Sequence, residues 1–148
     1  MADSPTKVLS IPSDLNAAWN AQQKVMEEVK ARGYSENAVF AIRLALDEAL
    51  NNAISHGNRR DKSKKVNIEY TIGEAAVTIT VSDEGTGFDP NHVPDPTLDE
   101  FLERPHGRGI MLMRAYMTDV RFGKGGNIVT LIKTRNCTLP GHGSNGAA

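Results

Sequence analysis

The sequence predicts an α+β fold, a two-layer α/β sandwich in which helices cover one face of a mostly antiparallel sheet. Three observations predict it. Two early stretches carry apolar residues at helical spacing, later stretches alternate apolar and polar residues as strands do, and a third apolar helical stretch stands between the strand pairs. Because 148 residues allow one compact domain, these elements are expected to share a single core.

Two helices are expected after a short extended segment at residues 7–11. The first follows Asp14 and ends at Gly33, and its apolar side chains recur every three or four positions. The second follows Ser35, a residue type whose hydroxyl caps helix N-termini, and runs from about Asn37 to Ser55. Its apolar stripe consists of Val39, Ile42, Leu46, Leu50 and Ala53.

Two hairpins are expected to form the sheet. Residues 66–72 and 77–81 alternate apolar and polar side chains around a short turn, and residues 120–122 and 128–133 form a second pair around a glycine-rich turn. Because side chains alternate between the two faces of a strand, Asp83 falls on the apolar face of the strand before it. That strand therefore aims a carboxylate along the buried side of the sheet.

A long loop and a third helix separate the hairpins. The loop, residues 88–106, carries four prolines among acidic residues, and a loop of this length in a compact domain is usually functional or disordered. We expect it to be mobile, with a short helix at residues 95–102. Residues 107–117 have little polar surface and predict a well-buried helix. Residues 137–148 predict a disordered tail after a domain of residues 1–136.

Composition excludes several classes of protein. The net charge is −1 and aromatic residues make up 5% of the chain, so neither a field that attracts nucleic acid nor a stacking surface is expected. No apolar run approaches the roughly 20 residues of a membrane span, and the N-terminus lacks a secretory pattern. Cys137 is the single cysteine. We therefore expect a cytoplasmic protein that binds neither nucleic acid nor membrane directly.

Two glycine-containing segments are candidates for binding a nucleotide. Asp83 is followed by Gly85 and Gly87, which places a carboxylate beside backbone that a ligand can approach closely, an arrangement suited to the amino group of adenine. The segment Gly107–Gly109 opens the third helix, where free N–H groups and the helix dipole favour phosphate. Taken alone, each segment is equally compatible with a tight turn or an ordinary helix start.

The second helix supplies candidates for chemistry. Glu48 and Asn52 are four residues apart and share a helix face. A carboxylate there can take a proton from an attacking hydroxyl, and an amide oxygen can ligate Mg²⁺. Asp47 and Asn51 are close competitors by sequence alone, and His56, one turn further, is more often a helix-end cap than a base.

Taken in order, these segments resemble the GHKL-type (Bergerat) ATP-binding fold and, within it, the anti-sigma factor serine/threonine kinases. The resemblance runs from about Leu9 to Lys133 and includes the stretches 53–57 and 87–90. It implies a histidine-kinase-like ATPase domain with a mobile ATP lid, acting as an ATP- and Mg²⁺-dependent protein kinase. Such a kinase binds a sigma factor and phosphorylates a serine on a small anti-anti-sigma protein of the STAS type. The resemblance also favours a homodimer.

The resemblance implies a role for each matching residue. These are Glu48 as the catalytic base, Asn52 as the Mg²⁺ ligand, Asp83 on adenine, Gly85 and Gly87 in the base pocket, Gly107, Arg108 and Gly109 at the phosphates, and Thr130 of the last strand on the adenine side. Arg104, which precedes the second glycine pair, receives no aligned role.

A different class of function uses the same residues. In that alternative the pocket holds ATP as a switch, and the protein is a non-catalytic partner-switch module that sequesters a regulatory protein. A histidine kinase core is disfavoured because the predicted first helix, residues 14–32, contains no histidine to accept phosphate.

Overall fold

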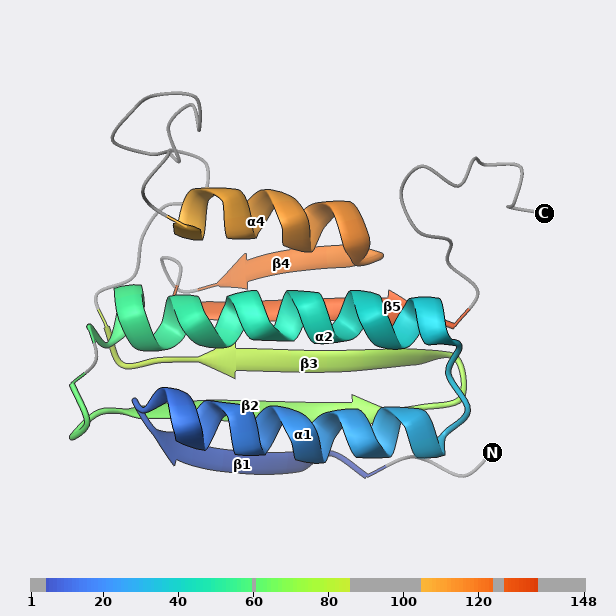
Figure 1. The fold of residues 1–148 in the computed structure, drawn as a ribbon, viewed down its shortest axis with the longest axis horizontal. Coiled ribbons are helices and arrows are strands. Elements are labelled where there is room, and N and C mark those ends of the chain that lie inside the picture. The colour runs from blue at the N-terminus through green and yellow to red at the C-terminus, as the bar shows by residue number, and fades with distance from the viewer. Residues whose placement is uncertain (1–4, 60, 86–104, 124–126, 136–148) are drawn as a thin grey trace.

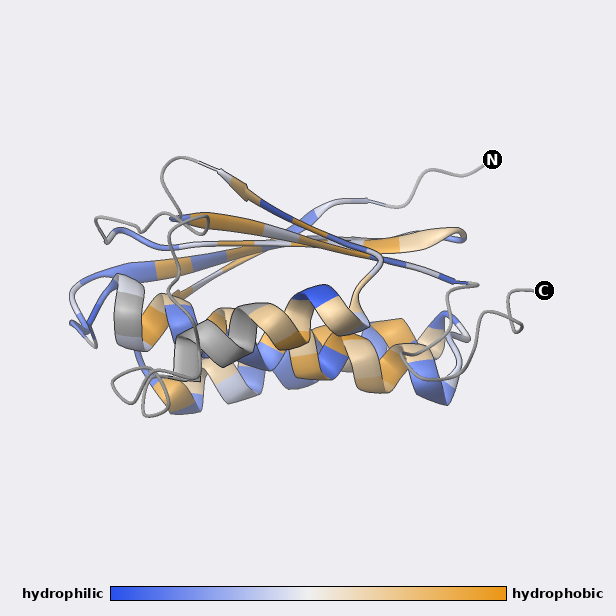
Figure 2. Ribbon diagram, turned by 90° about the horizontal axis from the view of Figure 1, so that it is seen from above, coloured by the Kyte–Doolittle hydropathy of each residue, from blue (hydrophilic) through white to orange (hydrophobic). Residues whose placement is uncertain are grey.

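The computed structural model describes residues 5–59, 61–85, 105–123 and 127–135. Its elements are β1 (Lys7–Pro12), α1 (Leu15–Ala31), α2 (Glu36–Asn51), the π-helical turn η1 (Asn52–Gly57), β2 (Lys65–Ile72), β3 (Ala76–Ser82), α4 (Pro105–Tyr116), β4 (Asp119–Gly123) and β5 (Ile128–Thr134). The strands form one antiparallel sheet in the order β1-β2-β3-β5-β4. Figures 1 and 2 show the described helices together on one face of this sheet, so the predicted two-layer sandwich is confirmed.

The two long helices begin where the capping residues predict. The Asp14 carboxylate accepts a hydrogen bond from the Ala17 N–H at 3.2 Å, and the Ser35 hydroxyl accepts one from the Ala38 N–H at 3.1 Å. These side chains satisfy amide groups that have no partner inside the helix. The second helix ends differently from the prediction, because η1 follows α2 with a wider turn. Turns of this kind often occur at functional sites.

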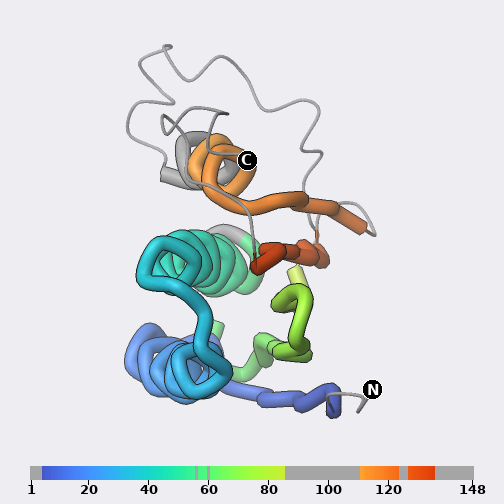
Figure 3. Tube along the Cα trace, turned by 90° about the vertical axis from the view of Figure 1, so that its right-hand side faces the viewer, coloured from blue at the N-terminus to red at the C-terminus, as the bar shows by residue number. Residues whose placement is uncertain are grey.

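Strand alternation sets which residues form the core. Every second residue of β2 and β3 is buried against the helices, whereas the residues between them lie on the outer face. The apolar stripes of α1 and α2 complete this core, and Figure 3 shows the two layers from the end of the sheet. Burying one side chain of the size of Ile68 or Ile79 contributes about 1.5–3 kcal/mol. The hairpin and the helix stripes predicted from periodicity are therefore confirmed.

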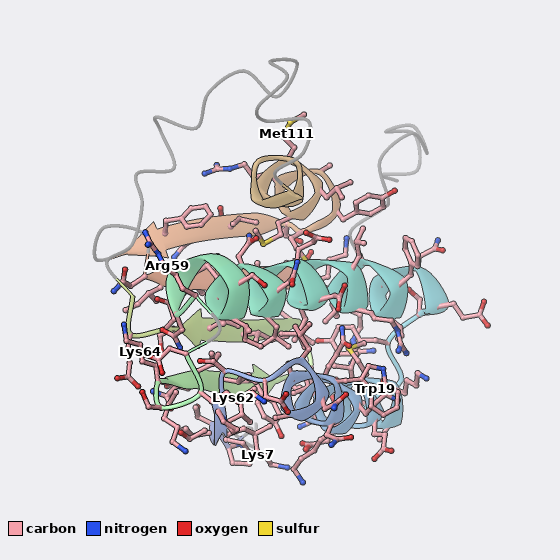
Figure 4. The ribbon with its side chains drawn as sticks, turned by 60° about the vertical axis from the view of Figure 1, so that its left-hand side comes forward. Lys7, Trp19, Arg59, Lys62, Lys64 and Met111 are labelled. Carbon is pink, nitrogen blue, oxygen red and sulfur yellow. The ribbon has the colours of Figure 1, made fainter. Side chains whose placement is uncertain are left out.

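The third predicted helix is less buried than its composition predicts. Met113 in α4 and Met117 just after it are buried, but Met111 is 55% exposed and Leu112 is 38% exposed. Figure 4 shows Met111 on the outer side of α4. The reason is one-sided packing: α4 contacts α2, η1 and β4 at the edge of the helix layer. The prediction of a well-buried helix was wrong for its outer face.

Some predictions fall on parts of the chain outside the described residues. These include most of the loop at 88–106, the short helix at 95–102, Gly87 and the tail at 137–148. Within the described ranges, no helix combines the length and the apolar character that crossing a bilayer requires.

A buried lysine joins α4 to the sheet. Lys133 of β5 is fully buried, and its Nζ donates a hydrogen bond to the carbonyl oxygen of Tyr116 at 2.8 Å. Tyr116 is the last residue of α4, where carbonyl groups lack partners inside the helix. The lysine therefore caps this helix from the neighbouring strand.

We predict that Lys133→Met lowers the free energy of unfolding by about 1–3 kcal/mol, because the Tyr116 carbonyl loses a charged donor while the buried volume is kept. Thermal and denaturant unfolding measure this change. Lys62→Met, at an exposed position, is the matched control and should change stability by less than about 0.5 kcal/mol. Equal stability of the two variants would contradict the capping role.

Candidate functional site

Three segments that are distant in the sequence meet at one end of the helix layer. They are the end of α2 with η1, the end of β3 and the beginning of α4 (Figure 1). Contacts of α4 with both α2 and η1 hold the helical parts together. The structure thus brings to one end of the fold the segments that carry Glu48 and Asn52, Asp83 and Gly85, and Gly107–Gly109.

The helix end carries a half-buried carboxylate and an unsatisfied amide oxygen. Glu48 is half-buried, and within the described part of the chain no hydrogen bond or ion pair reaches its carboxylate. Burial, and secondarily the nearby Asp47 carboxylate, raises the pKa of Glu48 above its ordinary value of 4.5. One turn further, the Oδ1 atom of Asn52 is buried without a hydrogen-bond partner among the described residues. Neither group has a hydrogen-bond partner among the described residues, which makes both candidates for binding a ligand.

The competing pair lies on another side of the same helix. Asp47 and Asn51 line a cavity of about 370 Å³ between α1 and α2, together with Trp19. The Asn51 Oδ1 atom also accepts a hydrogen bond from Ser55 Oγ at 3.3 Å. Consecutive helical positions differ by about 100° around the axis, so this pair is turned away from Glu48. The structure favours Glu48 and Asn52 as the pair that belongs to the site.

Asp83 sits where the strand and η1 touch. It follows β3 directly and lies on the face of the sheet that carries the helices. Gly85 N donates a hydrogen bond to Asp83 Oδ1 at 2.8 Å. Burial raises the pKa of Asp83 above its ordinary value of 3.8, and the hydrogen bond from Gly85 opposes that shift. This partly buried carboxylate is well suited to a ligand that donates hydrogen bonds.

Two glycines allow this contact. A Cβ atom on Gly57 would collide with the Asp83 carboxylate, and a Cβ atom on Gly85 would collide with the carbonyl oxygen of Gly57. The sequence predicts a site role for Gly85, whereas Gly57 belongs to the stretch 53–57 of the family resemblance without a role of its own. The signal available in the sequence was a glycine directly after the candidate helix face, without any indication of what it approaches.

Two asparagines that the sequence did not assign hold the turn that carries Asp83. Asn58 Oδ1 accepts a hydrogen bond from the Glu84 N–H at 2.8 Å. On the other side, the Asn127 carbonyl accepts one from the Asp83 N–H at 3.0 Å, and Asn127 Nδ2 donates to the carbonyl of Gly85. The Asn127 Oδ1 atom is buried without a partner among the described residues. In the sequence, Asn58 follows the predicted second helix and Asn127 ends the glycine-rich turn, and neither position indicates these contacts.

Thr130 is not part of this arrangement. It lies opposite Thr80 in the sheet, and the two hydroxyl oxygens are 3.1 Å apart. Its neighbours Val129 and Leu131 are buried against the helices, so Thr130 belongs to the outer face of the sheet. Asp83 lies on the opposite face, so the structure does not bring Thr130 together with Asp83, the residue predicted to contact adenine. Asn127, just before β5, is the residue from this region that reaches the site.

The third segment supplies a helix N-terminus. Gly107, Arg108 and Gly109 lie in the first turns of α4, which begins at Pro105. Proline is well suited to the first position of a helix because it lacks the N–H group that would have no partner there. The free amides of such a helix start carry a partial positive charge, which favours phosphate groups.

The sequence pattern of the histidine kinase-like ATPase domain family matches residues 11–133. The chain therefore belongs to the histidine kinase-like ATPase domain family, and the GHKL-type fold predicted from its motifs is confirmed.

Two curated proteins that are similar to this chain have the same name. The chain is 31% identical over 97 residues to the "Serine-protein kinase RsbW" of Bacillus subtilis (strain 168), a match that covers 60% of this chain and 59% of that protein. It is 30% identical over 98 residues to the protein of the same name from Listeria monocytogenes, with 60% of each chain covered. The chain thus spans about three fifths of the length of these curated relatives.

A solved structure shows the same fold. The RsbU and RsbW domains of Rv1364c from Mycobacterium tuberculosis superpose with a TM-score of 0.60 at 18% identity. This match covers 93% of this chain and 33% of that one. At this identity the likeness concerns the fold alone.

We predict that Gly57→Ala lowers the free energy of unfolding by about 1–3 kcal/mol, because the added methyl group has to displace the Asp83 carboxylate. Gly123→Ala is the matched control, since a Cβ atom there meets Ile128 only at 3.9 Å, an ordinary contact. Chemical denaturation of both variants measures the difference. A Gly57→Ala protein as stable as Gly123→Ala would show that the two segments are not in close contact.

Proposed function

We propose that this protein is an ATP-dependent serine/threonine protein kinase and an anti-sigma regulatory factor, which phosphorylates a serine on an anti-anti-sigma protein of the STAS type and binds a sigma factor. The observation that carries the proposal is the pair formed by the half-buried Glu48 carboxylate and the unsatisfied Asn52 Oδ1 atom, at the end of the fold where Asp83 and the start of α4 also lie. Family membership and the names of the relatives support it.

The adenine base would lie against the turn after β3. The Asp83 carboxylate would accept a hydrogen bond from the exocyclic amino group, and the unsatisfied Asn127 Oδ1 atom offers a second acceptor nearby. Gly57 and Gly85 keep the surrounding backbone free of side chains, and we propose that Gly87 extends this lining. Leaving the buried Asn127 Oδ1 atom unpaired would cost about 1–3 kcal/mol, which a donor on the ligand offsets.

The phosphates would lie at the start of α4, where we propose contacts with Gly107, Arg108 and Gly109. Mg²⁺ would be held by Asn52 Oδ1 and would neutralise phosphate charge. No group of three or more acidic, histidine or cysteine side chains in the described residues could hold a metal ion by itself. A single amide oxygen fits Mg²⁺, which usually binds through few protein ligands together with substrate phosphates and water.

Glu48 would act as the general base. A serine hydroxyl of the partner protein attacks the γ-phosphorus, its proton passes to the Glu48 carboxylate, and ADP leaves with the bridging oxygen. A raised pKa improves this role, because a base is most effective when its pKa approaches the working pH.

We further propose that the segment 88–106 covers the nucleotide as a lid, and that the protein is a cytoplasmic regulator of transcription that forms a homodimer.

We predict that Glu48→Ala lowers the rate of phosphate transfer to an anti-anti-sigma protein by about 10²–10⁴, while the Kd for ATP changes by less than about threefold, since the base acts on the attacking hydroxyl. Transfer of radiolabelled phosphate and titration calorimetry measure the two quantities. Glu27→Ala is the matched control, because Glu27 is an exposed carboxylate on α1 that does not contribute to the raised pKa of Glu48. Full transfer by Glu48→Ala would contradict the role of Glu48 as the base. A wild-type protein that transfers no phosphate, with regulation kept in Glu48→Ala, would favour the non-catalytic partner-switch module.

The raised pKa of Glu48 gives a pH dependence with a defined sign. The base acts when ionised, so kcat/KM should rise with pH through the Glu48 pKa and be lost as pH falls below it. The acid limb should therefore lie above pH 4.5, the ordinary value for this carboxyl. Rate measurements between pH 4 and 8 locate it, and Glu48→Gln should remove this limb along with most of the activity. An acid limb kept unchanged in Glu48→Gln would assign it to another group.

A further inference from the structure

Asn58 lies at the junction of three chain segments. It is 1% exposed, and its side-chain amide makes three hydrogen bonds. Oδ1 accepts from the Glu84 N–H at 2.8 Å, while Nδ2 donates to Ser13 Oγ at 2.8 Å and to the carbonyl of Lys65 at 3.0 Å. One buried amide therefore connects the β1–α1 junction, the start of β2 and the turn after β3.

Two further hydrogen bonds extend the network around this amide. Ser13, also 1% exposed, donates its hydroxyl proton to the carbonyl of Lys64 at 2.8 Å. The Glu84 carboxylate accepts a hydrogen bond from the Lys65 N–H at 2.6 Å. The buried members of this network, Asn58 and Ser13, have hydrogen-bonded side chains, and satisfied buried groups of this kind fix one geometry because a displacement leaves a polar group without a partner. The backbone at Glu84 is consequently held from two directions.

The hydrogen bond from the Glu84 N–H to Asn58 affects Asp83, because Asp83 and Glu84 are consecutive residues. Fixing the Glu84 N–H fixes the peptide plane that leaves Asp83, and with it the direction from which its carboxylate projects. The backbone N–H of Asn58 also donates to the carbonyl of Ala53 at 2.8 Å, which closes η1. Asn58 thus holds both the turn that carries Asp83 and the helical turn that begins at Asn52.

We infer that Asn58 is a positioning residue for recognition of the adenine base. It acts through Asp83, whose carboxylate it holds in the direction needed to accept the hydrogen bond of the exocyclic amino group. This inference rests on the proposed nucleotide-binding function. In this inference, the acceptor atom Oδ1 of Asn58 contributes to base selectivity, and the donor atom Nδ2 contributes to stability.

The test compares ATP with inosine triphosphate, which carries a carbonyl oxygen where ATP carries the amino group. An oxygen facing the Asp83 carboxylate replaces attraction by repulsion, so the wild-type protein should bind ATP roughly tenfold or more tightly than inosine triphosphate. In Asn58→Ala, the Kd for ATP should rise by roughly tenfold while that for inosine triphosphate changes little, so the ratio falls towards one. Calorimetric titration of both nucleotides gives the ratio.

Two further variants separate positioning from stability. Ser13→Ala removes a member of the same network that does not touch Glu84, so it should lower the unfolding temperature and keep the wild-type ratio. Asn58→Asp keeps an acceptor for the Glu84 N–H but loses the donors, so it should also be less stable and keep the ratio. If Asn58→Ala does not fold, Asn58→Ser, which lacks the reach to Glu84, replaces it in the comparison.

The outcomes distinguish this inference from the function on which it rests. A wild-type protein that binds neither nucleotide would overturn the proposed function. A wild-type protein that prefers ATP, combined with an Asn58→Ala protein that keeps this preference, would overturn the positioning role alone. Loss of the preference in Ser13→Ala to the same extent as in Asn58→Ala would also overturn it, because the network would then act only through stability.

Discussion

The site depends on the close approach of two backbone segments, one at Gly57 and the other at Gly85. Neither position has room for a Cβ atom, because the Asp83 carboxylate lies against the first and the Gly57 carbonyl against the second. This contact joins the helix layer to the sheet at the end where β3 finishes. The end of α2 with η1, which carries Glu48 and Asn52, therefore lies at the same end of the fold as the end of β3, which Asp83 follows (Figure 1).

The polar groups around this contact fall into two kinds. The amide of Asn58 is fully hydrogen-bonded and holds the backbone, whereas the Oδ1 atoms of Asn52 and Asn127 are buried without partners among the described residues. A buried acceptor without a donor costs about 1–3 kcal/mol. The fold therefore keeps its structural amides satisfied and leaves unsatisfied those at the proposed ligand site, where a base donor or a cation would offset the cost.

The elements of the fold could be predicted from sequence because each one repeats a strong local pattern. Asp14 and Ser35 mark helix starts, and strand alternation alone placed Asp83 on the helix-covered face. The same alternation, applied to Val129 and Leu131, would have placed Thr130 on the outer face, and the role taken from family resemblance overlooked it. The contacts of Gly57, Asn58 and Asn127 depend on segments far apart in the chain, so no local pattern could reveal them.

Amide NMR spectra recorded during titration with ATP and Mg²⁺ test most directly whether the three segments enclose one nucleotide. We predict that the amide signals of residues 52–58, 83–85 and 107–109 shift together, with one common saturation curve, while those near Trp19 in the cavity between α1 and α2 remain unchanged. Shifts confined to the α1–α2 cavity, or no saturable shift in these three segments, would contradict a shared nucleotide site.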